Sequence, residues 1–159
     1  MKKTLLVLLL AMFAVNIHAQ IVGESESYRW DEICSIRAMH SKLKCRINVN
    51  TGEKMYQIYA ETTNRFDNFC LTLGDLSNAI KTVEYLFDFM DTSKSGDIKA
   101  VNLADGKILT LKLGSFIGQK ELTLLLSDCA GTTDIYYKEL KKVLNTLTEI
   151  EDKAYGHQR

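Results

Sequence analysis

The chain contains no proline in 159 residues, although proline supplies about 5% of an average protein. It also contains no C-x-x-C pair among its four cysteines. A thioredoxin-like oxidoreductase needs a cis-proline beside its thiols as well as a closely spaced cysteine pair. The two absences therefore argue against disulfide exchange as the function.

Patterns for metal and phosphate binding are missing as well. The cysteines do not form the short doublets that zinc sites use. Gly114 and Gly118 are not followed by the lysine and hydroxyl residue of a phosphate-binding loop. We therefore expect no cofactor and no resident metal.

The sequence has no surplus of charge of one sign, with 20 basic and 20 acidic residues. Without Lys2 and Lys3, which belong to the amino-terminal segment described next, 18 basic residues face 20 acidic ones, a net charge of −2. Binding to nucleic acid depends on cations that neutralise the phosphates. Nucleic acid is therefore not an expected partner.

Residues 1–19 have the pattern of a secretory signal peptide. Lys2 and Lys3 precede an apolar run over residues 5–15, and Ala19 offers a small residue for cleavage. The run is shorter than the roughly 20 residues of a membrane-spanning helix, and no other segment approaches that length. We expect an exported protein, periplasmic or extracellular, with no transmembrane segment and with one domain over residues 20–159.

Four cysteines in an exported chain are compatible with two disulfides. A turn near residues 39–42 would place Cys34 opposite Cys45 on neighbouring antiparallel strands, and we predict a disulfide between them. Cys70 and Cys129 would then pair by elimination. The alternative is that some cysteines are reduced residues of the core.

The mature sequence presents one order of strands and helix twice. In the first half, strands are predicted at residues 44–49, 54–60 and 69–73, followed by a helix that Asp75 caps and that runs to Met90. In the second half, strands are predicted at residues 98–103, 108–113 and 121–126, followed by a helix from Thr133 or Asp134 to Ile150.

This order indicates a tandem duplication with pseudo-repeats at about 43–94 and 95–153. Short matches support it: Ile47-Asn48-Val49 precedes Gly52 as Val101-Asn102-Leu103 precedes Gly106, and Leu71-Thr72-Leu73 resembles Leu122-Thr123-Leu124. The alternative is that unrelated hairpins of this kind look alike.

Strands that follow one another without helices pair antiparallel. We predict an α+β fold with one antiparallel sheet of six to seven strands, the seventh at residues 32–38, and two helices on one face. The helices would cover Ile47, Val49, Phe69, Leu71, Leu73, Leu109, Leu111, Leu113, Leu122, Leu124 and Leu126. The opposite face would be polar and open to solvent or to a partner.

Residues 91–98 resemble the start of the calcium-binding loop of EF-hand proteins. Asp91, Ser93 and Ser95 match its oxygen ligands, and Gly96 matches its glycine. Asn102 stands where the family has a bidentate glutamate, and a hairpin follows where the family has a second helix. The resemblance implies only a weak calcium site, and we predict no metal site here.

We predict a small non-enzymatic binding or interaction protein that uses the open sheet face or a sheet edge. The predicted ligand-binding residues are Lys44, Arg46, Asn48, Tyr59 and Lys112. The partner would be a protein or a small ligand, and the sequence does not define the oligomeric state. The other hypothesis is a small periplasmic hydrolase or thiol enzyme in which Cys70 or Cys129 acts with His40.

Overall fold

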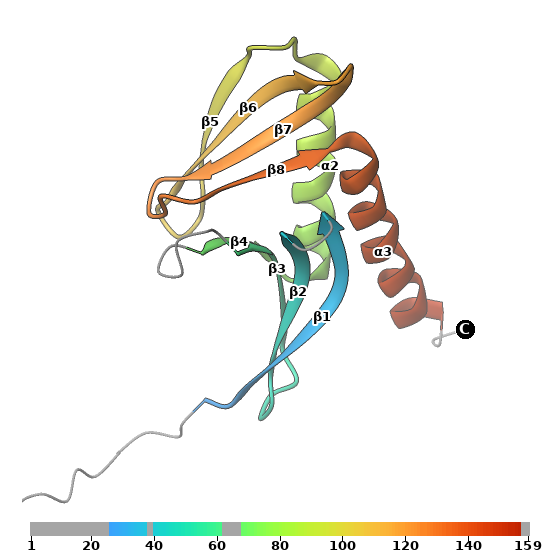
Figure 1. Ribbon diagram of the computed structural model, residues 1–159. Coiled ribbons are helices and arrows are strands. Elements are labelled where there is room, and N and C mark those ends of the chain that lie inside the picture. Colours follow the sequence, from blue (N-terminus) through green and yellow to red (C-terminus); the bar gives the residue numbers. More distant parts are fainter. Residues whose placement is uncertain (1–25, 38–39, 62–67, 157–159) are drawn as a thin grey trace, which may run out of the picture.

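The computed structural model describes residues 26–37, 40–61 and 68–156. The predicted signal peptide, residues 1–19, lies outside the described residues. Within them the chain forms two sets of four strands, and each set is followed by a helix. Figure 1 shows the two sets as separate sheets, one above the other.

The first sheet, sheet A, has the strand order β1-β2-β3-β4, and each neighbouring pair is antiparallel. Its strands are β1 (Tyr28–Arg37), β2 (Ser41–Asn48), β3 (Lys54–Ala60) and β4 (Phe69–Gly74). Helix α2 (Leu76–Thr92) follows β4.

The second sheet, sheet B, repeats this arrangement with the antiparallel order β5-β6-β7-β8. Its strands are β5 (Ile98–Asn102), β6 (Ile108–Phe116), β7 (Gln119–Leu126) and β8 (Thr132–Tyr136). Helix α3 (Tyr137–Gly156) follows β8.

The α+β class is therefore confirmed, but the prediction of one continuous sheet of six to seven strands is wrong. A helix of 17 residues separates β4 from β5, and at 1.5 Å per residue it carries the chain about 25 Å along its axis. The chain then begins a new sheet instead of returning to the free edge of β4.

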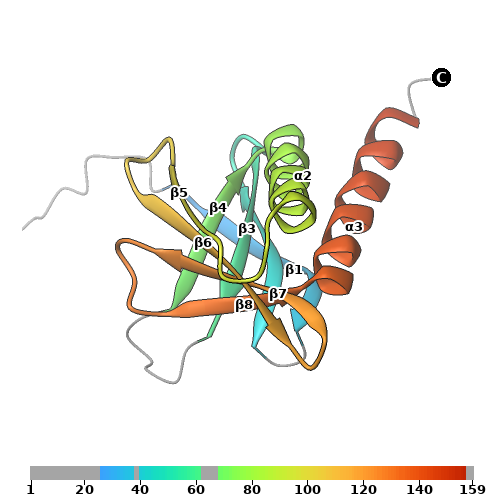
Figure 2. The same cartoon turned by 90° about the horizontal axis from the view of Figure 1, so that it is seen from above.

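The helices hold the two sheets together and do not share one face of a single layer. α2 packs on β3, β4 and α3, whereas α3 packs on β1 of sheet A and on β7 and β8 of sheet B. Figure 2 shows the two helices next to each other beside the crossing strands. One continuous cluster of buried apolar residues links all these elements.

Most of the predicted core positions are buried. The two leucines of β4, Phe69 and the predicted leucines of β6 and β7 lie in this cluster. Ile47 is only partly buried. Val49 is 60% exposed, because β2 ends at Asn48 and Val49 belongs to the following turn. Its predicted place in the core is therefore wrong.

The start of α2 matches its prediction, whereas the start of α3 does not. Asp75 has an extended backbone, and its carboxylate accepts a hydrogen bond from the Asn78 amide at 2.9 Å, as an N-cap does. Residues 132–136, in contrast, form β8, and α3 begins at Tyr137. Thr133 and Ile135 are buried in alternation along this strand, which is a strand periodicity.

None of the described helices combines the length and the apolar character that crossing a bilayer requires.

Candidate functional site

One surface of sheet A gathers most of the predicted binding residues. Across its strands Lys44 lies opposite Gln57, Arg46 lies opposite both Trp30 and Met55, and Tyr59 lies opposite Cys70. The alternate residues of the central strands, such as Leu43, Tyr56 and Ile58, point into the core. We call the surface that carries Trp30, Lys44, Arg46, Gln57, Tyr59 and Cys70 the open face.

The open face contains a pocket of about 370 Å³. Its lining residues come from all four strands of sheet A: Trp30, Lys44, Gln57, Tyr59 and Cys70. Trp30 is 52% exposed, so one indole surface is available to a ligand. This volume lies at the lower end of the range of roughly 300–1,000 Å³ that is usual for small-molecule sites.

Two cations on the open face rest on aromatic rings instead of pairing with carboxylates. The Lys44 ammonium lies 3.5 Å from the centre of the Tyr59 ring, and the Arg46 guanidinium lies 4.5 Å from the centre of the Tyr28 ring. Among the described residues, no carboxylate lies within ion-pair distance of either cation. Both positive charges are therefore available to an anion.

A third cation of this face, Lys42, is paired with a carboxylate. The Lys42 ammonium lies 2.9 Å from the Glu32 carboxylate, and this contact raises the pKa of Lys42. The charge of Glu32 is thereby paired with Lys42, which lies two residues before Lys44 on the same face of β2. Lys44 is thus the lining cation of the pocket that has no carboxylate within ion-pair distance among the described residues.

Gln57 and Cys70 form the floor of the pocket. Gln57 is only 6% exposed, and its side-chain carbonyl oxygen accepts a hydrogen bond from the Cys70 thiol. Burial raises the pKa of Cys70, although the positive charges of Lys107 and Lys44 act in the opposite direction. At neutral pH Cys70 is therefore a thiol, which is a poor nucleophile.

The structure brings three of the five predicted binding residues together: Lys44, Arg46 and Tyr59. The side-chain oxygen of Asn48 instead accepts hydrogen bonds from the backbone amides of Asn50 and Thr51, at 2.9 and 3.2 Å. Asn48 thus stabilises the β2–β3 turn. Lys112 lies on β6 of sheet B, so the division into two sheets separates it from the open face.

Sequence reasoning missed Trp30 and Gln57 as site residues. Trp30 lies outside the strand predicted at residues 32–38, whereas β1 begins four residues earlier, at Tyr28. Gln57 lies two residues before Tyr59 on β3 and therefore faces the same side of the sheet. This alternation predicts Gln57 as a site residue once the register is known.

The predicted disulfide depended on a register that the structure does not have. Cys34 lies opposite Leu43, and Cys45 lies opposite Asp31, so the expectation that the two cysteines face each other is wrong. Cys34, Cys45 and Cys70 form no disulfide in the structure. Burial raises the pKa of both Cys34 and Cys45. The Cys129 sulfur lies 3.4 Å from the Asn68 carbonyl oxygen, where the β7–β8 loop meets sheet A.

His40, the base of the enzyme hypothesis, lies in the β1–β2 turn. Its backbone donates to Arg37 and accepts from Glu61, each at 3.1 Å. In the part of the chain that the structure describes, the His40 side chain forms no hydrogen bond with the Cys70 thiol, whose partner is Gln57. Cys70 and His40 therefore do not form a nucleophile and base pair in this geometry.

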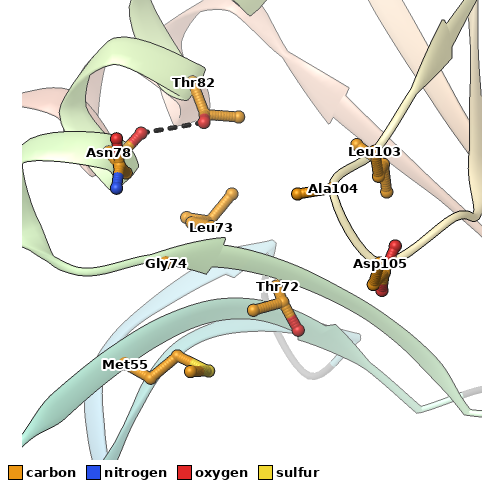
Figure 3. Close-up of a pocket in the computed structure, with 9 residues that line it drawn as sticks. All are labelled: Met55, Thr72, Leu73, Gly74, Asn78, Thr82, Leu103, Ala104 and Asp105. Atoms are coloured by element: carbon orange, nitrogen blue, oxygen red, sulfur yellow. Dashed lines mark hydrogen bonds between the residues drawn. The ribbon is translucent and has the colours of Figure 1, made fainter.

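A larger pocket of about 570 Å³ lies between the two sheets at the start of α2. Figure 3 shows Asn78 and Thr82 of α2 on one side and Leu103, Ala104 and Asp105 on the other. Its polar groups serve the fold, since the Thr82 hydroxyl donates to the Asn78 carbonyl and Lys107 pairs with Asp105. Four of its nine lining residues are polar or charged, namely Thr72, Asn78, Thr82 and Asp105, and the others are apolar.

The segment that resembles an EF-hand loop connects α2 to β5. The Asp97 carboxylate accepts a hydrogen bond from the Lys94 amide at 2.8 Å. The Asp97 carbonyl, which would be a calcium ligand in the family, accepts one from the Leu113 amide at 3.0 Å. The carboxylate thus stabilises the turn within the connection, and the carbonyl fastens the connection to β6.

No protein-family model, curated protein or solved structure matches the chain.

Proposed function

We propose that this chain is a small exported, non-enzymatic binding protein and that the open face of sheet A is its binding surface. One observation carries the proposal: Lys44 and Tyr59, chosen from the sequence, line one pocket together with the exposed Trp30 ring. A concave site with aromatic walls and a few polar groups is the usual form of a small-molecule site.

The chemistry of the pocket supports binding over catalysis. Its one nucleophile, Cys70, is a buried thiol with a raised pKa, and its hydrogen-bond partner is a neutral amide. A catalytic cysteine needs a lowered pKa or an adjacent base. The thiol-enzyme hypothesis with Cys70 and His40 therefore has less support.

The test is recovery of a bound small molecule with the protein as the cell makes it. The mature protein is purified natively, and molecules released by denaturation are identified by mass spectrometry. The Lys44→Gln/Arg46→Gln double variant removes both unpaired cations of the open face. We expect it to lose the ligand that the wild type retains and to melt close to the wild-type temperature, since neither side chain belongs to the buried core.

Lys112→Gln is the matched control, because it removes an exposed lysine from the middle of a strand in sheet B. We expect this variant to retain the ligand at the wild-type level. Equal amounts of ligand in all three proteins, including none, would contradict the assignment of the open face.

We also propose that the chain is exported and that cleavage after Ala19 leaves Gln20 as the first residue. The basic start, the apolar run and the small residue at the exit support this proposal. Expression of the full chain in a Gram-negative host should give a mature protein in the periplasm or medium whose intact mass lacks residues 1–19. A cytoplasmic product of full mass would contradict it.

We further propose that the halves arose by tandem duplication of a unit of four strands and one helix, β1 to α2 and β5 to α3. The repeated element order supports this. The short residue matches do not align with this unit. Gly52 lies between the second and third strands of its half, β2 and β3, whereas Gly106 lies between the first and second strands of its half, β5 and β6. Superposition of the two halves strand for strand would support the proposal, and different strand geometry in the two halves would contradict it.

A further inference from the structure

We propose that the pocket of the open face binds a small aromatic carboxylate, with its ring against Trp30 and Tyr59 and its carboxylate at Lys44. This inference rests on the proposed function and names the class of ligand that the same pocket would take.

The walls of the pocket favour a flat, apolar ring. Apolar surface dominates the lining, and two of its five residues are aromatic. The indole of Trp30 is half exposed, so its ring can stack with a ligand at the offset distances that aromatic pairs adopt. A sugar would require many hydrogen-bonding groups, and among the lining residues only Lys44, Gln57 and the Tyr59 hydroxyl offer strong ones.

The cations determine the charge of the ligand. The ammonium of Lys44 lines the pocket and is held at 3.5 Å from the Tyr59 ring centre. Arg46 follows two residues later on the same face of β2, about 7 Å along the strand. Neither cation has a carboxylate partner among the described residues, so an incoming anion displaces no ion pair.

The number of cations favours a carboxylate over a phosphate group. Only one ammonium lines the pocket, and none of its lining residues lies at a helix N-terminus, the feature that commonly binds phosphate in proteins. A single ammonium beside an aromatic wall matches a monoanion attached to a ring. The Gln57 carboxamide at the floor can orient a polar substituent on that ring, since only its oxygen is used by Cys70.

The experiment compares benzoate with benzamide, its neutral analogue of nearly equal shape. Trp30 is the only tryptophan, so its fluorescence and its indole resonance in a ¹H–¹⁵N spectrum report directly on the pocket. We expect benzoate to shift the indole signal and the amides around Lys44 and Tyr59. Benzamide should bind at least about tenfold more weakly, because it lacks the charge-assisted contact with Lys44.

Two variants locate the charge. Lys44→Gln should bind benzoate and benzamide with similar affinity, whereas Lys112→Gln should keep the wild-type difference. The ¹H–¹⁵N spectrum of Lys44→Gln must retain the native dispersion, which shows that the variant is folded. Cyclohexanecarboxylate, which has the charge without the flat ring, should bind several-fold more weakly than benzoate.

The inference is overturned by equal affinities of the wild type for benzoate and benzamide. It is equally overturned by the absence of any shift at the Trp30 indole with benzoate up to about 50 mM, well above the millimolar range of a weak ligand. In either case, a copurified ligand that still depends on Lys44 and Arg46 would preserve the proposed function and exclude only this ligand class.

Discussion

At the scale of single residues, the two tyrosines of β3 have different roles. Tyr56 is buried in the core, whereas Tyr59 lines the pocket of the open face. The difference follows from strand alternation, because residues an odd number of positions apart face opposite sides of a sheet. One strand thus contributes both to the stability of sheet A and to its candidate site.

The buried Tyr56 phenol should make stability depend on pH in the alkaline range. Burial, with a smaller contribution from Cys45, raises the pKa of Tyr56 from 10.0 to about 12. The folded state therefore disfavours ionisation of Tyr56, and its contribution to stability is complete below pH 10 and is lost as the pH rises towards 12. Over that window the free energy of unfolding should fall by about 1 kcal/mol per pH unit because of this group.

Denaturant unfolding at several pH values from 8 to 11 tests this expectation, with urea as the denaturant. The Tyr56→Phe variant should show a shallower loss of stability above pH 10 than the wild type. Tyr137→Phe, at an exposed position on α3, is the control and should follow the wild-type slope. Parallel curves for Tyr56→Phe and the wild type would refute the assignment.

Some residue roles could be predicted from the sequence and others could not. Lys44, Arg46 and Tyr59 share one face because alternation along a strand depends only on local geometry. The turn-stabilising role of Asn48 was missed, because a residue at the end of a strand can serve either the sheet face or the turn. The position of Cys34 opposite Leu43 depends on register shifts in the β1–β2 ladder, and no local sequence pattern predicts these shifts.

At the scale of elements, the starts of the two helices show where a local capping pattern predicts the structure and where it does not. Asp75 caps α2 as its sequence pattern predicts. Residues 132–136 contain Thr133 and Asp134, which also suit a helix start, yet they pair with β7 as strand β8. The Asp134 carboxylate accepts a hydrogen bond from the Thr123 hydroxyl across the sheet at 2.7 Å. Tertiary pairing therefore outweighs the local capping signal here.

The cap of α2 should stabilise the protein measurably. Asp75→Ala removes the acceptor of the Asn78 amide, and we expect a loss of about 1 kcal/mol in the free energy of unfolding. Ser77→Ala, at an exposed position in the first turn of the same helix, is the control and should change stability little. A loss of the same size in both variants would contradict the capping role.

The β6–β7 turn contains strain that a substitution should relieve. Ile117 has a backbone φ of 50° and is 85% exposed, and a β-branched residue is unfavourable in this left-handed region. Asparagine tolerates it and is common before glycine in two-residue hairpin turns. We expect Ile117→Asn to raise the free energy of unfolding by about 0.5–1 kcal/mol, measured by urea unfolding. Ile117→Val, which keeps the branching, should give no such gain.

At the scale of the whole molecule, the two sheets share one hydrophobic core. α3 contacts both sheets, and Arg37 at the end of β1 lies 3.7 Å from Glu121 and 3.9 Å from Asp134 in sheet B. Its guanidinium also donates to the Tyr136 hydroxyl at 3.3 Å. The sheets are therefore joined by a shared core and by a polar contact at its rim.

Truncation of a core residue on α3 should weaken both sheets equally. Leu140→Ala removes a fully buried side chain, and we expect a loss of about 2–5 kcal/mol. Hydrogen exchange at amides of β2 and of β7 should accelerate by the same factor, because both exchange through global unfolding. Lys141→Ala, an exposed neighbour, is the control. Faster exchange in sheet B alone would show that the sheets unfold independently.

The division into two sheets could not be predicted from the sequence. Alternation identifies the buried side of a strand, but it does not identify the neighbouring strand. The leucines of β6 and β7 and those of β4 have the same pattern whether they share one sheet or lie in two. The position of Lys112 on a different sheet from Arg46 follows from this long-range choice, which is why the predicted site was only partly assembled.

The most direct test of the central claim is a map of amide shifts between the protein purified with its ligand and the same protein after the ligand has been removed. If the open face of sheet A is the binding surface, the largest amide shifts will cluster at Trp30, Lys44, Gln57, Tyr59 and Cys70. The amide signal of Lys112 will not shift. The largest shifts around Lys112 in sheet B, or around Asn78 and Leu103 in the larger pocket, would contradict the account.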